Sequence, residues 1–190
     1  MRARFVSTTV VVLLIAGCGA TVMRADHDEP GSPEQSRIQI GYRYAYSQGI
    51  KLSLAGKNRA SVGLGSYLVN GVGGCNDCHT APPYTKDPEA FLGAPKQINL
   101  ACYLAGGTEF GPFVSRDITP WENGKPAGLT FAQFKHLIRT GEDPDNPGQV
   151  LHVMPWPVYQ TMSDHDLRAV YDYLSAIPAI PANTCGTPSE

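Results

Sequence analysis

The sequence Cys75-Asn76-Asp77-Cys78-His79 decides how the rest of the chain is interpreted. It places two thiols and an imidazole side by side, with two residues between the cysteines and the histidine directly after the second. Three kinds of site use this spacing: half of a zinc site, a redox-active disulfide, and the attachment point of a c-type haem. The surrounding sequence discriminates among these three.

The other cysteines argue against zinc and against a thioredoxin-like disulfide. They are single and distant, whereas zinc requires further Cys or His at ligand spacing. A thioredoxin-like site requires alternating strands and helices around the motif, and the chain has no such pattern. In a haem c site, Cys75 and Cys78 form thioethers to the vinyl groups and His79 is the proximal iron ligand. No second Cys-x-x-Cys-His occurs, so the sequence predicts one covalent haem c.

The N-terminus has the pattern of a secretory signal. Two arginines precede a short apolar run, which is too short for a comfortable transmembrane helix. The run ends in small residues followed by a cysteine, a pattern that resembles a bacterial lipobox. We expect residues 1–17 to be a signal peptide and Cys18 to be acylated; the alternative is an ordinary cleaved signal with an incidental cysteine. The residues concerned are Arg2, Arg4 and Leu14-Ile15-Ala16-Gly17-Cys18.

Export determines the environment of the mature chain. We expect it to be lipid-anchored on the periplasmic side of a bacterial membrane, where conditions are oxidising. The two remaining cysteines, Cys102 and Cys185, are then free to form a disulfide. Without residues 1–17 the chain carries 13 basic and 17 acidic residues, a net charge of −4. This mild acidity argues against a nucleic-acid partner, which requires a basic excess.

Three segments follow the signal peptide. Residues 18–37 are charged and contain proline and glycine, which predicts a lipid anchor and flexible tether. Residues 38–57 alternate apolar and polar side chains, which predicts an extended lead-in segment. Residues 58–190 form the predicted folded domain. The alternating apolar residues are Ile38, Ile40, Tyr42, Tyr44, Tyr46, Ile50, Leu52 and Leu54.

Three helices are predicted within this domain. The first covers about residues 58–71, where apolar residues recur every four positions. The second begins at a Thr130-x-x-Gln133 capping box and ends at Gly141. The third begins at Ser163 and carries an apolar stripe that ends before Pro178. Loops rich in glycine and proline separate them, so the fold is predicted to be all-α.

Short motifs around these helices extend the pattern. They are Gly65-Ser66-Tyr67-Leu68, Leu104-Ala105-Gly106-Gly107, Asp117-Ile118-Thr119-Pro120, Gly128-Leu129-Thr130 with Phe134, Arg139-Thr140-Gly141, and Met154-Pro155-Trp156 followed by Tyr159. On these residues the chain resembles a class I cytochrome c domain over about residues 58–181, and in particular those associated with bacterial periplasmic dehydrogenases. The resemblance implies a class I cytochrome c fold with long Gly/Pro-rich loops around one haem. The long insert at residues 101–128 departs from the family pattern.

The sixth ligand of the iron has several candidates in the sequence. Met154 lies in a proline-rich loop ahead of the third predicted helix, and His152 is two residues away. Met162 directly precedes the Ser163 cap, so packing is its better interpretation. His136 and His165 lie on predicted helices and are more typical of solvated or packed side chains. The family resemblance selects Met154, a thioether ligand that raises the reduction potential and fills the coordination site.

Three further residues are weaker candidates for contacts with the haem propionates: Arg116, Trp121 and Trp156. Arginine would pair with a carboxylate, and the indole N–H groups would donate hydrogen bonds. For each of them, packing or a solvated charge is an equally good interpretation.

Extracytoplasmic electron transfer is the function that these features predict, without catalysis by the chain itself. Its partner would be a redox protein: a dehydrogenase, another cytochrome or an oxidase. A haem enzyme or gas sensor is the alternative, and it requires an open or weakly held sixth position. A filled position, with Met154 as ligand, argues against that alternative.

Overall fold

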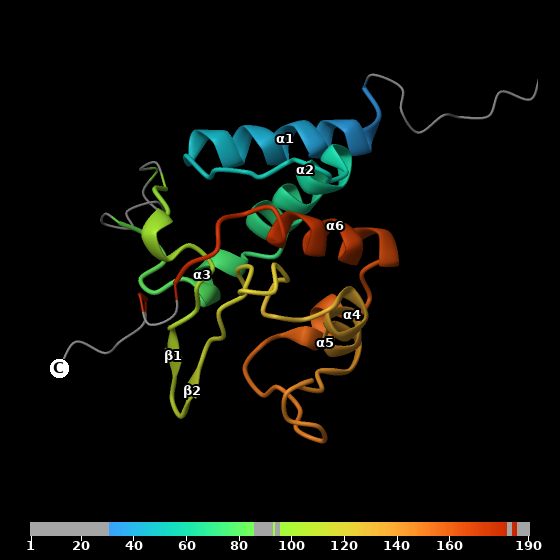
Figure 1. The fold of residues 1–190 in the computed structure, drawn as a ribbon. Coiled ribbons are helices and arrows are strands. Elements are labelled where there is room, and N and C mark those ends of the chain that lie inside the picture. The colour runs from blue at the N-terminus through green and yellow to red at the C-terminus, as the bar shows by residue number, and fades with distance from the viewer. Residues whose placement is uncertain (1–30, 86–92, 94–95, 182–183, 186–190) are drawn as a thin grey trace, which may run out of the picture.

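The structure is a computed structural model that describes residues 31–85, 93, 96–181 and 184–185. The predicted signal peptide and Cys18 lie outside these residues. The fold is helix-rich, with little sheet, and is compatible with a cytochrome c fold (Figure 1). Its α-helices are α1 (Pro33–Ser47), α2 (Arg59–Tyr67), α3 (Cys75–His79), α4 (Phe131–Thr140), α5 (Trp156–Tyr159) and α6 (Asp164–Leu174). The other elements are the π-helical turn η1 (Leu68–Val72), the 3-10 turn η3 (Leu100–Cys102) and the strands β1 (Glu109–Phe110) and β2 (Phe113–Val114).

The helix α1 forms one edge of the molecule and crosses α2, while α6 packs against the other side of α2 (Figure 1). Glycines allow the close approach of α1 and α2. A Cβ atom on Gly41 would lie 2.0 Å from the carbonyl oxygen of Gly63. The hydroxyl of Ser66 uses this proximity to donate a 2.7 Å hydrogen bond to the Gly41 carbonyl. These contacts join the N-terminal helix to the domain.

The helix α1 overturns part of the predicted domain organisation. Residues 38–57 were expected to be extended and residues 18–37 to be a tether, yet α1 occupies Pro33–Ser47. The period-2 alternation of isoleucines and tyrosines misled the prediction. The buried positions are Ile38, Gly41 and Ala45, three and four residues apart, and this is helical spacing.

The start of α1 has a capping serine and a proline in the first turn, both typical of helix starts, although the charged composition of this region had predicted a tether. The Ser32 side chain accepts a 3.1 Å hydrogen bond from the Gln35 N–H, and a proline occupies the first turn. Beyond α1, residues 50–54 do run without helix, as expected. Within them, the Ser53 N–H donates to the Ala176 carbonyl at 2.8 Å, which fixes this stretch to the chain after α6.

The three predicted helices are confirmed. Asn58 caps the first, which runs through α2 into η1. The second is α4, with both hydrogen bonds of the Thr130 capping box present and Gly141 in a left-handed conformation at its end. The third is α6, capped by Ser163, and it ends at Leu174, slightly earlier than the apolar stripe suggested.

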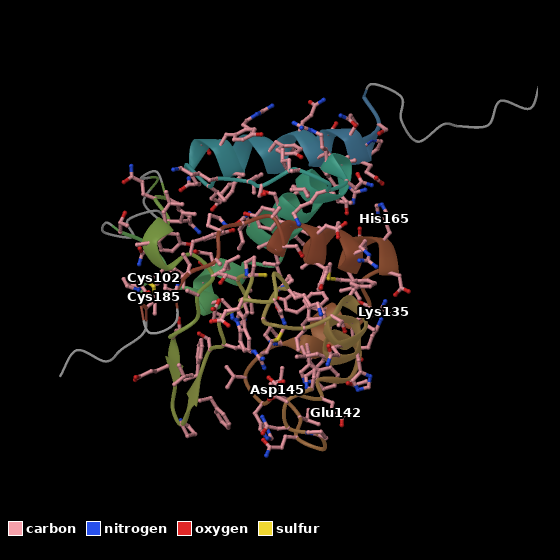
Figure 2. The ribbon with its side chains drawn as sticks, in the orientation of Figure 1. Cys102, Lys135, Glu142, Asp145, His165 and Cys185 are labelled. Atoms are coloured by element: carbon pink, nitrogen blue, oxygen red, sulfur yellow. A yellow bond between two sulfur atoms is a disulfide. The ribbon has the colours of Figure 1, made fainter. Side chains whose placement is uncertain are left out.

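The insert at residues 101–128 contains the β1–β2 hairpin, a small addition to an otherwise helical fold. The insert also begins at a covalent link. Cys102 forms a disulfide with Cys185, with the Cα atoms 5.5 Å apart, as the sequence predicted. The pair lies at one edge of the molecule in Figure 2. Within the described residues, no helix combines the length and apolar character needed to cross a membrane.

Candidate haem-binding site

A cavity of about 610 Å³ opens between α3 and the hairpin on one side and α4, α5 and α6 on the other. Its volume lies in the range typical of small-molecule and cofactor sites. The predicted haem residues Cys75, Cys78, His79 and Met154 all line it. The structure therefore brings together four side chains that span 80 residues of sequence.

The helix α3 presents the two cysteines. It consists of residues 75–79 alone, and Gly74 directly before it adopts a φ of 59°, a conformation that favours glycine. Cys75 and Cys78 are three residues apart and so share a face of the helix. Burial raises the pKa of Cys75 to about 12. Burial and the nearby Asp77 carboxylate also raise the pKa of Cys78, so both side chains are thiols at neutral pH.

The ring of His79 is held by the main chain of the insert. Its Nδ1 atom lies 2.7 Å from the carbonyl oxygen of Arg116. A carbonyl only accepts hydrogen bonds, so Nδ1–H is the donor and Nε2 keeps its lone pair. Burial lowers the pKa of His79, which favours the neutral ring at pH 7. An imidazole oriented in this way is suited to bind a metal through Nε2.

The loop that carries Met154 is fixed by hydrogen bonds from α5. The Trp156 indole donates to the Leu151 carbonyl at 3.2 Å, and the Trp156 main-chain N–H donates to the Met154 carbonyl at 2.8 Å. The Tyr159 hydroxyl donates to the carbonyl of Gly73 at 2.8 Å. This last bond ties the methionine side of the cavity to the residues just before α3.

The competing ligands divide into two groups. His152 and Met162 line the same cavity, whereas His136 and His165 do not. The His152 ring packs against Phe113 of the hairpin, with the ring centroids 5.7 Å apart. Met162 packs against both hydrophobic clusters of the core, in agreement with the packing role expected for it.

The two remaining histidines are engaged at the surface. His136 lies 2.9 Å from the Glu142 carboxylate. His165 lies 3.7 Å from carboxylate oxygens of both Glu34 and Asp166. Both histidines therefore lie near carboxylates and neither lines the cavity, although Asp166 itself does.

Arg116 alone lines the cavity among the three candidates for propionate contacts. Its guanidinium lies 2.5 Å from the Asp145 carboxylate and 3.6 Å from that of Asp143, and it stacks 4.8 Å from the centroid of the Trp121 ring. Its Nε atom is buried and has no hydrogen-bond partner among the described residues. The Trp156 N–H is already donated to the main chain, so packing is the better account of Trp156.

The insert was the part of the site that sequence reasoning left without a role. Its hairpin lines the cavity together with Ser115, Arg116 and Ile118, and the insert supplies the carbonyl that orients His79. No residue-type signal marks such a carbonyl, because every residue has one. The insert thus lines one side of the cavity, although it departs from the family pattern.

These residues fit a haem c. The cavity holds two thiols on one short helix, an imidazole with a free Nε2, a thioether, and a guanidinium atom without a partner. A haem would use the thiols for attachment, the imidazole and thioether as iron ligands, and the guanidinium beside a carboxylate. When bound, such a haem supplies one-electron redox chemistry.

Comparison with known proteins agrees with this site. The chain is 28% identical over 122 residues to the cytochrome c subunit of alcohol dehydrogenase (quinone) from Gluconobacter oxydans (strain 621H), covering 63% of this chain and 24% of that protein. It is 29% identical over 128 residues to the gluconate 2-dehydrogenase cytochrome c subunit of Pantoea cypripedii, covering 66% and 26%. The chain thus spans about a quarter of the length of these relatives. No protein-family model and no solved structure matches. The two similarities support a cytochrome c-like domain.

Proposed function

We propose that this chain transfers single electrons outside the cytoplasm through one covalent haem c, as a carrier or as the electron-accepting subunit of a dehydrogenase or respiratory complex. Cys75 and Cys78 form the thioethers, and His79 and Met154 are the axial iron ligands. The single observation that carries the proposal is the cavity lined by all four of these side chains.

Attachment follows from the chemistry of α3. Each thiol would add across one vinyl double bond, with the sulfur bonding to one vinyl carbon and a hydrogen going to the other, so that no group leaves. With His79 and Met154 as the two iron ligands, substrates would have no access to the metal, and the haem would supply one-electron transfer through its edge. The Nδ1 hydrogen bond of His79 keeps its ring oriented in both redox states.

Exposed apolar side chains favour a protein partner at the cavity. Five exposed residues line it where it meets solvent, and large exposed apolar patches are typical of interaction sites. They are Val72, Phe113, Val114, Val153 and Val158. A redox protein that docks there would approach the haem edge directly. Both relatives are named as cytochrome c subunits of dehydrogenases, which favours a dehydrogenase as the partner.

The proposed location is the periplasmic side of a bacterial membrane. It is supported by the signal pattern of residues 1–17 and by the disulfide between Cys102 and Cys185, which requires an oxidising compartment. Acylation of Cys18 would hold the domain at the membrane beside its partners.

Stopped-flow spectroscopy tests the proposal. The ferrous protein, mixed with an oxidised soluble cytochrome or copper protein, should be oxidised rapidly. At neutral pH it should not bind carbon monoxide. A variant with Met154→Ala is the control for an open iron and should bind carbon monoxide. Rapid carbon monoxide binding by the unaltered protein, or sustained peroxidase turnover, would favour a haem enzyme or gas sensor.

A further inference from the structure

One face of α1 takes no part in the core or in the cavity. Its exposed side chains follow one another at intervals of one to three residues along the helix and together form a single stripe, which we call the α1 stripe. The stripe consists of Ser36, Gln39, Ile40, Arg43, Tyr46 and Ser47. Within it, Ile40 is 46% exposed and Tyr46 is 60% exposed. Two large side chains of this kind on a solvent-facing stripe favour contact with a second surface.

The α1 stripe lies in the basic part of the chain. Residues 33–74 carry five basic residues and one acidic residue, a net charge of +4. The acidic one, Glu34, lies 3.7 Å from His165 of α6. Arg43 lies on the stripe and has no side-chain hydrogen bond or ion pair among the described residues. Another of these five basic residues, Arg59 at the start of α2, lies beside α1, because the Tyr42 hydroxyl donates to its carbonyl.

Most of the residues that line the cavity belong to the acidic part of the chain. From residue 75 onward, the described residues include ten acidic and six basic residues, a net charge of −4. In Figure 2 the labelled Glu142 and Asp145 lie at the end of the molecule away from α1. No residue of α1 lines the cavity. A surface bound to the α1 stripe would therefore leave the cavity accessible.

We propose that the α1 stripe lies on the anionic lipid head groups of the membrane. Helix α1 begins 15 residues after Cys18, so a chain anchored there keeps α1 within about 50 Å of the bilayer even when fully extended. Arginine is attracted to anionic head groups, and tyrosine prefers the membrane–water interface. The inference rests on the proposed function only in that the anchor would keep the α1 stripe close to the membrane. Contact between the stripe and lipid is a separate property of the folded domain.

Binding in this way would orient the domain. Helix α1 would face the bilayer, and the acidic part of the chain would be repelled from the same anionic surface. The cavity and its exposed apolar residues would then face the water, where a redox partner docks. Binding through α1 would hold the domain in one orientation, whereas the tether alone would leave it free to rotate.

Vesicle sedimentation tests the proposal without the acyl chain. The haem-loaded mature chain with Cys18→Ser should bind vesicles of phosphatidylglycerol and phosphatidylcholine in equal parts, and should not bind vesicles of phosphatidylcholine alone. Raising the salt concentration should weaken this binding. Adding Arg43→Glu should weaken it roughly tenfold, because one substitution removes a positive charge and adds a negative one.

Lys125→Glu is the matched control, since it makes the same charge change at a partly exposed position in the acidic part of the chain. It should change vesicle binding by less than about twofold. The proposal is wrong if the unsubstituted stripe gives no binding to anionic vesicles, or if Arg43→Glu and Lys125→Glu have equal effects. It is also wrong if Arg43→Glu abolishes binding to a redox protein while vesicle binding is unchanged, because the stripe would then be a protein interface. Failure of fatty-acid labelling at Cys18 would refute the anchor alone.

Discussion

The two sides of the cavity are built in different ways. On the His79 side, one short helix carries both cysteines and the histidine, and a main-chain carbonyl fixes the ring. On the Met154 side, a loop without regular structure carries the methionine, and its position depends on hydrogen bonds from α5. The first arrangement places its three side chains within five consecutive residues of a helix, with one distant contact from the Arg116 carbonyl. The second is a loop without helical support, held from α5 and joined to a distant part of the chain by the bond from Tyr159 to Gly73. The difference predicts that the methionine side responds more strongly than the histidine side to changes far from the iron.

The largest effect is expected from Cys75→Ser combined with Cys78→Ser. Without thioethers the chain should lose its haem on purification and fail to fold stably, because the cavity would lack the group that fills it. Denatured mass spectrometry should show one added haem for the unaltered protein and none for the variant. Haem that is released from the unaltered protein by acid–organic extraction would contradict covalent attachment.

Removing the disulfide is the next largest change, and it acts mainly on the methionine side. The link closes a loop of 83 residues that includes α4, α5, α6 and Met154, and also the Arg116 carbonyl, but not α3. Cys102→Ser with Cys185→Ser should lower the free energy of unfolding by about 4 kcal/mol, mainly through the unfolded chain. In denaturant titrations, the iron–methionine absorption band should disappear well before the haem loses His79. Simultaneous loss of both ligands would contradict the proposed difference between the two sides.

Gly141→Ala tests the packing beneath the methionine loop. Gly141 has a φ of 74°, and a Cβ atom there would lie 2.3 Å from the Trp156 ring. The substitution should lower the free energy of unfolding by about 3 kcal/mol, from left-handed strain and from displacement of the indole. It should also weaken the iron–methionine band.

The matched control for Gly141→Ala is Gly148→Ala. Gly148 also has a positive φ, of 86°, but a Cβ atom there would meet nothing within 4 Å. Chemical denaturation should show a loss of only about 1 kcal/mol, the cost of the backbone conformation. Equal losses for the two variants would show that contact with Trp156 does not support the loop.

The smallest effect concerns Asp143, which pairs with Arg116. Burial raises the pKa of Asp143, but hydrogen bonds from the Asn146 side chain and the Asp145 N–H, with the charge of Arg116, more than offset this and hold the pKa below its usual value of 3.8. A lowered pKa means that the stabilisation is complete above pH 3.8 and is lost as the pH falls through the folded-state value. The loss should be under about 1 kcal/mol, since the pair is partly solvated. Asp143→Asn should remove this contribution from the pH dependence of unfolding, and an unchanged slope would refute it.

The same contrast explains what the sequence could predict. Signals confined to a few neighbouring residues succeeded: the Thr130 capping box, Gly141 and Ser163 all mark real helix ends. The prediction failed at α1, where alternating tyrosines outweighed the helical spacing of its three buried residues. The Arg116 carbonyl was beyond prediction, because its role depends on a fold that brings it to a histidine 37 residues away.

The central claim is that one iron lies between His79 and Met154. Near-infrared magnetic circular dichroism of the ferric protein tests it most directly, because the energy of its charge-transfer band identifies the axial pair. The account predicts a histidine–methionine band that survives Met162→Ala and disappears with Met154→Ala. A bis-histidine band in the unaltered protein that is lost with His152→Ala would contradict it, as would a band that survives Met154→Ala and disappears with Met162→Ala.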